Sequence, residues 1–107
     1  MPTPTPLPVQ RAARDIGSHF DAWRKLRGLT VRQVADRAGV SDKTVARFVT
    51  DSGSVSVENM LRIARAVGIL DELVTATDPL STDIGRLRSG EQLPKRESKE
   101  PSDDKRA

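Results

Sequence analysis

The sequence predicts an all-α fold, and three observations predict it. Apolar residues recur at steps of three and four along the middle of the chain. Capping residues and glycines stand at the ends of these periodic segments. No segment alternates apolar and polar residues as a half-buried strand would. We therefore expect a compact five-helix domain whose helices span Arg11–Leu26, Val31–Ala38, Asp42–Val49, Val57–Val67 and Leu70–Thr75.

The first helix is predicted from an apolar stripe that repeats at helical spacing. We expect its largest member, Trp23, to fill the core. Gly28 follows the last periodic residue and can take the left-handed conformation that ends a helix. The stripe consists of Ile16, Phe20, Trp23 and Leu26.

The second and third helices carry the clearest local signals. Thr30 and Gln33 have the spacing of a capping box at the start of the second helix, and Ser41 is a natural N-cap for the third. Gly39 lies in the short turn between them, where a positive φ is expected. A short glycine-containing turn between two short helices sets them at a steep angle, which is the helix-turn-helix arrangement. Their predicted inward residues are Val34, Val40, Val45 and Phe48.

The third helix is then expected to present four residues outward: Asp42, Lys43, Ala46 and Arg47. In a helix-turn-helix unit the start of the second helix of the pair enters the major groove of DNA. Lys43 and Arg47 suit guanine O6 and N7, Asp42 suits cytosine N4, and Ala46 suits a thymine methyl.

The fourth helix is predicted to start after the cap Ser56 and to end at Gly68. Its expected buried stripe is Met60, Ile63, Ala64 and Val67.

The two ends differ in composition from this helical domain, which we place at residues 11–76. Residues 1–10 alternate proline with threonine or other residues and predict a flexible arm. Residues 77–94 carry scattered apolar side chains and predict a partly ordered segment that contacts a second copy or a partner. Residues 95–107 are almost entirely charged, Pro or Ser, which predicts a disordered tail.

Charge and composition narrow the function. The net charge is +3, but residues 11–50 hold nine Lys or Arg against four Asp or Glu. This balance favours a polyanionic partner, and a solvated helical surface is the alternative. There is no cysteine and one histidine, His19, which we expect at the surface. With no nucleophile–base pair and no ligand cluster, we expect neither an enzyme nor a metal or cofactor site. No long apolar run or secretory signal is present, so a cytoplasmic location without membrane contact is the default.

Three stretches together resemble the phage-repressor and Cro-type helix-turn-helix family, and so a lambda-repressor-like fold. These are "IGSHFDAWR" at 16–24, "GLTVRQVADRAGVSDKTVARF" at 28–48 and "ENMLRIARAVG" at 58–68. The resemblance implies a transcriptional repressor that binds double-stranded DNA. It would act as a homodimer on a palindromic operator, because one such domain makes few base contacts. Phosphate contacts are implied for Arg32, Ser41 and Thr44, with Lys25 and Arg27 as further contacts if they face the DNA backbone.

Several positions depart from the family pattern. Val31 stands where many relatives have a phosphate-binding Gln, and Val49 stands where a Glu often pairs with the arginine matching Arg24. We expect Arg24 to pair with Asp51 or to stay solvated. "VTDSGS" at 49–54 predicts a longer or looser loop. The negative charge of Asp42 also costs DNA affinity near phosphates unless it pairs with a cytosine. Together, Val31, Val49 and Asp42 keep open an alternative, a protein-interaction module that has lost DNA binding.

The continuation "VGILDELVTATDPLSTDIGRLRSGEQLPKR" at 67–96 is similar to the tail of HipB-like antitoxins. That similarity implies a kinase-like toxin as a partner and autoregulation of the shared operon.

Overall fold

The computed structural model describes residues 3–92, and every regular element in that range is helical. The chain divides after Leu70 into two compact units, which are described separately below. The α-helices are α1 (Leu7–Leu26), α2 (Val31–Ala38), α3 (Asp42–Thr50), α4 (Val57–Val67), α5 (Leu70–Thr77) and α6 (Asp83–Gln92), and two short 3-10 turns are η1 (Ser52–Ser54) and η2 (Pro79–Ser81).

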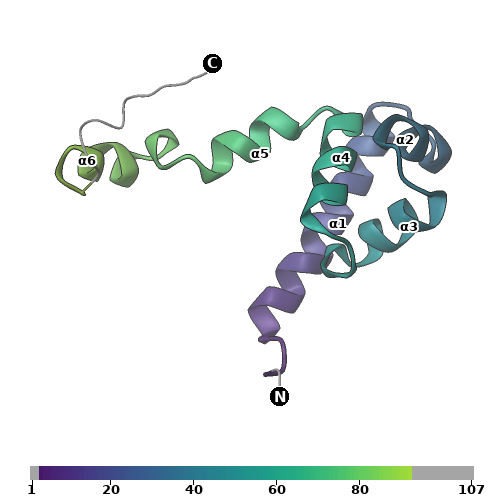
Figure 1. The fold of residues 1–107 in the computed structure, drawn as a ribbon, viewed down its shortest axis with the longest axis horizontal. Helices are drawn as coiled ribbons and strands as arrows, with labels where there is room; N and C mark the ends of the chain where they lie inside the picture. Colours follow the sequence, from purple (N-terminus) through teal and green to yellow (C-terminus); the bar gives the residue numbers. More distant parts are fainter. Residues whose placement is uncertain (1–2, 93–107) are drawn as a thin grey trace. The chain divides into compact units, whose positions relative to one another are not determined.

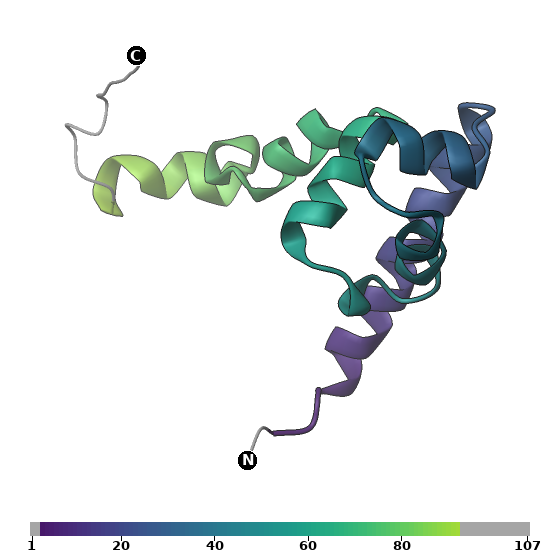
Figure 2. The same ribbon diagram turned by 45° about the vertical axis from the view of Figure 1, so that its right-hand side comes forward.

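In the first unit, α3 and α4 pack on α1, α2 packs on α3 and α4, and the first turns of α1 protrude beyond them (Figure 1). The axes of α2 and α3 cross steeply. Figure 1 shows α2 nearly end-on and α3 lying across the view. In Figure 2, α3 is seen nearly end-on and α2 lies across the view. The all-α prediction and the helix-turn-helix arrangement of α2 and α3 are therefore confirmed.

The core of the first unit centres on two aromatic rings from α1 and α3. Phe20 and Phe48 meet edge to face with their ring centroids 4.7 Å apart, a favoured aromatic geometry. Aliphatic side chains of α2, α3 and α4 surround this pair. The buried apolar residues are Phe20, Leu29, Val34, Ala35, Ala38, Val45, Phe48, Ile63, Ala64, Val67 and Ile69. Of the predicted inward residues, Val40 and Met60 are only half-buried.

The predicted caps of α2 and α4 are confirmed by their hydrogen bonds, whereas α3 ends at Thr50, one residue beyond its predicted end. Thr30 Oγ1 accepts from the Gln33 amide at 3.1 Å while Gln33 Oε1 accepts from the Thr30 amide at 2.9 Å, which completes the capping box. Ser56 caps α4 through the amide of Asn59. Gly39 has φ 72°, so the turn between α2 and α3 uses the left-handed backbone that glycine adopts at low cost.

Two predictions about α1 were wrong. The helix begins at Leu7 rather than Arg11, because Pro8 lies in the first turn, where its missing amide hydrogen would have no helical acceptor. The predicted apolar stripe also does not form the buried face. Within that stripe only Phe20 is buried, whereas Trp23 is 39% exposed and Leu26 is 76% exposed. Gly17 is the second buried residue of α1.

The second unit contains nearly all of α5, then η2 and α6. The sequence did not predict α6, which makes a sixth helix, and α5 extends two residues beyond its predicted end. Gly85 of α6 approaches η2 so closely that a Cβ would overlap the carbonyl of Pro79. The apolar residues Val74, Leu80, Ile84 and Leu87 are more than half exposed. Leu93 and the predicted tail at 95–107 lie outside the described residues.

Within residues 3–92, no helix combines the length and apolarity needed to cross a membrane. The same part of the chain holds no group of three or more potential metal-ligating side chains.

Candidate nucleic-acid interface

The outward face of α3 lies where the sequence predicted it. Asp42, Lys43, Ala46 and Arg47 are all exposed, while Val45 and Phe48 on the opposite side are buried. Within residues 3–92, neither Lys43 nor Arg47 forms a side-chain hydrogen bond or an ion pair. The two cations therefore project from a helix that is anchored in the core. Among residues 3–92 they have no partner that DNA binding would have to displace.

The start of α3 is fixed by a pair of hydroxyl side chains. Ser41 Oγ accepts from the Thr44 amide at 3.0 Å and lies 2.9 Å from Thr44 Oγ1. Ser41 is exposed and Thr44 half-buried. Since one hydroxyl donates to the other, one hydroxyl hydrogen remains for an outside acceptor such as a phosphate oxygen.

Asp42 has a cationic neighbour that the sequence did not suggest. Arg32 Nε of α2 lies 3.7 Å from Asp42 Oδ2, and both side chains are exposed. An exposed pair contributes about 0–1 kcal/mol, so a nucleic acid can displace it at little cost. The pair also offsets the negative charge that Asp42 would bring close to phosphates.

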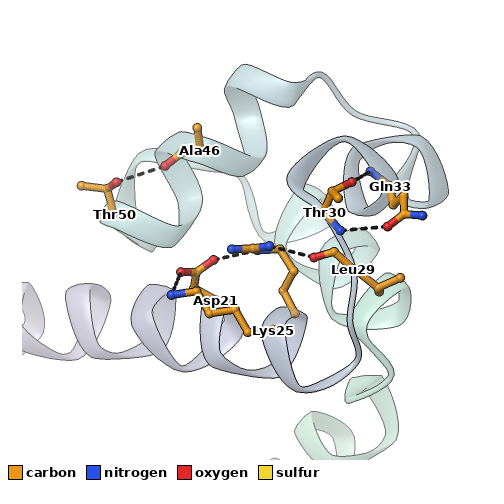
Figure 3. Close-up of polar contacts among 8 residues, drawn as sticks. Asp21, Lys25, Leu29, Thr30, Gln33, Ala46 and Thr50 are labelled. Atoms are coloured by element: carbon orange, nitrogen blue, oxygen red, sulfur yellow. Dashed lines mark hydrogen bonds and ion pairs between the residues drawn. The ribbon is translucent and has the colours of Figure 1, made fainter.

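Arg24 holds the entry to α2 in place. Its Nε donates to Asp21 Oδ1 at 2.8 Å and its Nη1 donates to the Leu29 carbonyl at 2.7 Å, next to the capping box (Figure 3). The prediction that Arg24 pairs with Asp51 or stays solvated was wrong. Asp21 lies one turn earlier on the same helix, whereas the carboxylate of Asp51 caps η1.

Asp21 is also 3.4 Å from the Lys25 ammonium. Burial acts to raise the pKa of Asp21, but the hydrogen bonds and charges of Arg24 and Lys25 outweigh it and hold that pKa below its ordinary value. Lys25 itself is 68% exposed. Its ammonium can leave this pair for a phosphate, so the predicted role of Lys25 stays a prediction.

Arg27 has a structural role within the first unit. Its Nε donates to the Val67 carbonyl at 3.1 Å and its Nη2 to the Gly68 carbonyl at 3.4 Å, so it caps the C-terminal end of α4. Its guanidinium also lies over the Trp23 ring, 5.2 Å from the centroid. These contacts use two of the five N–H donors of Arg27 and hold its side chain against α4, so its predicted phosphate role stays a prediction.

Val31 and Val49, which depart from the family pattern, do not disturb the fold around them. Val31 and Val49 are both half-buried, so they replace polar positions by packed apolar ones. The predicted looser loop after α3 is instead the 3-10 turn η1. It is closed by the Asp51 side chain, which accepts from the Gly53 amide at 3.0 Å.

Two adjoining hollows lie beside this face, and the sequence did not indicate the residues of one of them. The first hollow, lined by Lys43, Ala46, Arg47, Thr50, Asp51 and Ser54, runs along α3. The second, of about 580 Å³, lies between η1 and the first turns of α1. Val9 and Gln10 were missed because the first helix was expected to begin at Arg11, whereas Ala13 and Arg14 lie in the predicted helix but have no local pattern that marks a site.

Comparison with known proteins finds one similarity, and it covers the helix-turn-helix unit. Residues 21–72 match the helix-turn-helix family model. This match supports the Cro-type family and a DNA-binding transcription regulator, with the matched segment covering α2, α3 and α4. No curated protein and no solved structure matched the chain.

Proposed function

We propose that this chain is a sequence-specific DNA-binding repressor that reads its operator with the exposed face of α3. The observation that carries the proposal is that Lys43 and Arg47 are exposed on a helix-turn-helix unit and have no side-chain partner among residues 3–92. In this arrangement the two cations contact guanine edges, while Asp42 and Ala46 read neighbouring base pairs. Arg32, Ser41 and Thr44 contact phosphates at the start of the two helices and fix the register.

We further propose that the repressor binds as a homodimer to a palindromic operator, with half-sites about one helical turn apart. One unit offers few base-reading side chains, and a second copy doubles them. The apolar residues of the second unit support this proposal, because Leu80, Ile84 and Leu87 are 51%, 70% and 75% exposed. Ile84 and Leu87 lie three positions apart on α6 and so on one side of that helix, and an exposed apolar patch marks a protein contact surface.

We also propose that this repressor acts as an antitoxin. Its support is the similarity of residues 67–96 to the tails of HipB-like antitoxins, which implies a kinase-like toxin as partner and repression of the shared operon. A kinase-like reading frame beside this gene, and a complex of the two purified products, would test it. The cytoplasmic location stays a prediction.

The central experiment replaces Arg47 by alanine. An operator is first selected from random duplexes with the wild-type chain, and binding is then followed by fluorescence anisotropy. We expect Arg47→Ala to weaken operator binding by about 1–3 kcal/mol and to relax specificity at one base pair. Lys43→Ala should behave in the same way at a neighbouring base pair.

The matched control is Arg65→Ala, which removes an exposed arginine on α4 that belongs to neither hollow. An equal loss for Arg65→Ala would refute a specific role of Arg47. A loss for Arg47→Ala that is uniform over all DNA sequences would make Arg47 a phosphate contact rather than a base contact.

The alternative, an interaction module of the same fold, is favoured by the apolar Val31 and Val49. A salt titration of the wild-type chain separates the two functions. A DNA binder loses affinity linearly on a log–log plot as salt rises. An interaction module shows no binding to the selected duplexes at any salt concentration.

A further inference from the structure

The hollow along α3 and the hollow beside α1 adjoin, because Asp51 and Ser54 line both of them. We call the combined surface the α1–α3 groove. It leads from the exposed face of α3 across η1 to the first turns of α1, which Figure 1 shows projecting past α3. Its lining residues are Thr5, Val9, Gln10, Ala13, Arg14, Lys43, Ala46, Arg47, Thr50, Asp51, Gly53 and Ser54.

A direct hydrogen bond joins η1 to α1 at the base of the groove. Ser52 Oγ donates to the Ala13 carbonyl at 2.7 Å, across 39 positions of sequence. Gly53 lies so close to α1 that a Cβ added to it would be 3.5 Å from Ala13 Cβ. These contacts hold α1 at Ala13 against η1, the turn that follows α3.

The charges along the groove suit a polyanion that passes over both ends. Lys43 and Arg47 lie at the α3 end, and Arg14 lies at the α1 end. Arg14 is exposed and, within residues 3–92, makes no side-chain hydrogen bond or ion pair. The carboxylate of Asp51 is the acidic group in the lining, and one of its oxygens already accepts from the Gly53 amide. The uncharged lining is mixed, because Thr5, Gln10, Thr50 and Ser54 bear hydroxyl or amide groups while the others are apolar or glycine.

We propose that the DNA interface extends along the α1–α3 groove, with Arg14 binding the phosphodiester backbone beside the major groove that α3 reads. This inference rests on the proposed function and adds a second contact region to it. The residues that form the α1 wall, from Thr5 to Arg14, all precede the segment 21–72 that matches the helix-turn-helix family model. The extended start of α1 therefore supplies a contact that the matched segment does not contain.

The test compares Arg14→Ala with the wild-type full-length chain on two probes, the selected operator and a random 30-base-pair duplex. Each neutralised phosphate contributes about 0.9 to the log–log salt slope. We expect the slope to fall by about one unit on both probes. The ratio of variant to wild-type dissociation constants should accordingly shrink about threefold between 50 and 200 mM salt. Arg14→Lys keeps the charge and should restore most of the slope.

The matched control is Arg11→Ala, which removes an exposed arginine three residues earlier on α1 that does not line the groove. Its slope should stay at the wild-type value. An equal loss for Arg11→Ala and Arg14→Ala would overturn the groove in favour of a diffuse effect of charge. An unchanged slope for Arg14→Ala, in a chain that still binds its operator, would overturn the inference alone. Failure of the wild-type chain to bind either duplex would overturn the proposed function as well.

Discussion

At the scale of single residues, some arginines of the first unit stabilise the fold and others are available to bind a partner. The residues next to them in the sequence do not show which arginine has which role. Arg24, Arg27 and Arg62 donate to main-chain carbonyls of other segments and hold the fold together. Arg14 and Arg47 make no such contacts within residues 3–92. The basic balance of residues 11–50 indicated a polyanion partner, but part of that charge is structural. For Arg27 the acceptors lie 40 and 41 positions away, which no local pattern reveals.

The carboxylate of Asp21 gives the stability of the first unit a dependence on pH. Because Arg24 and Lys25 hold its folded-state pKa below the ordinary value, the unfolded chain binds more protons than the folded one in acid. The contribution of Asp21 is therefore complete above its unfolded pKa of about 3.9 and is lost as the pH falls through the lower folded pKa.

We expect Asp21→Asn to lower the free energy of unfolding by about 1 kcal/mol at pH 7, because it removes one charge-assisted hydrogen bond. Urea unfolding of both proteins between pH 7 and pH 2 measures the difference. The two curves should run parallel above about pH 5 and converge below about pH 4. A difference that grows as the pH falls would contradict the assignment.

At the scale of elements, the sequence predicted the helices best where their signals are local. The bounds of α2 and α4 were predicted correctly, because each has a hydroxyl cap at its start and a left-handed glycine after its end. The buried face of α1 was predicted wrongly, because periodicity alone does not show which neighbour a helix meets. Gly17 determines that face: it lets α3 approach so closely that α1 buries Gly17 rather than Trp23.

Gly17→Ala tests this close approach. A Cβ at Gly17 would overlap the carbonyl oxygen of Phe48 and lie 3.0 Å from the carbonyl carbon of Val49, and neither backbone atom can move without shifting α3. Alanine normally favours a helix over glycine by about 1 kcal/mol. We nevertheless expect a loss of about 1–3 kcal/mol from the overlap, measured by urea unfolding.

The control for this prediction is Ser18→Ala, a change at an exposed neighbouring position on the same helix. It should leave stability unchanged or raise it slightly through helix propensity. A Gly17→Ala protein at least as stable as wild type would show that α1 and α3 can separate without cost.

At the scale of the whole molecule, the two units have surfaces of different character. The first unit has a packed core and an interface built on charged side chains. Within the described part of the second unit, α5 has no buried residue, and the large apolar side chains of η2 and α6 are exposed. The sequence indicated this difference only as scattered apolar residues at 77–94, because α6 lacks a strong apolar periodicity. This difference supports the proposal that the first unit reads DNA and that the second unit associates with a second copy of the chain.

Leu87→Asp tests that division in the intact chain. Leu87 is 75% exposed, so an aspartate is compatible with the folded unit but not with an apolar contact to a second copy. Loss of one buried leucine contact is expected to raise the dimer dissociation constant about 10- to 100-fold. Sedimentation velocity over a range of concentrations measures that constant.

The control is Arg88→Gln, which changes the charge by one unit at the adjacent exposed position. It should keep the wild-type dimer dissociation constant. Since the α3 face is untouched, Leu87→Asp should bind a single half-site normally and lose affinity only for the palindrome. Equal losses on both probes would place the second unit in DNA contact instead.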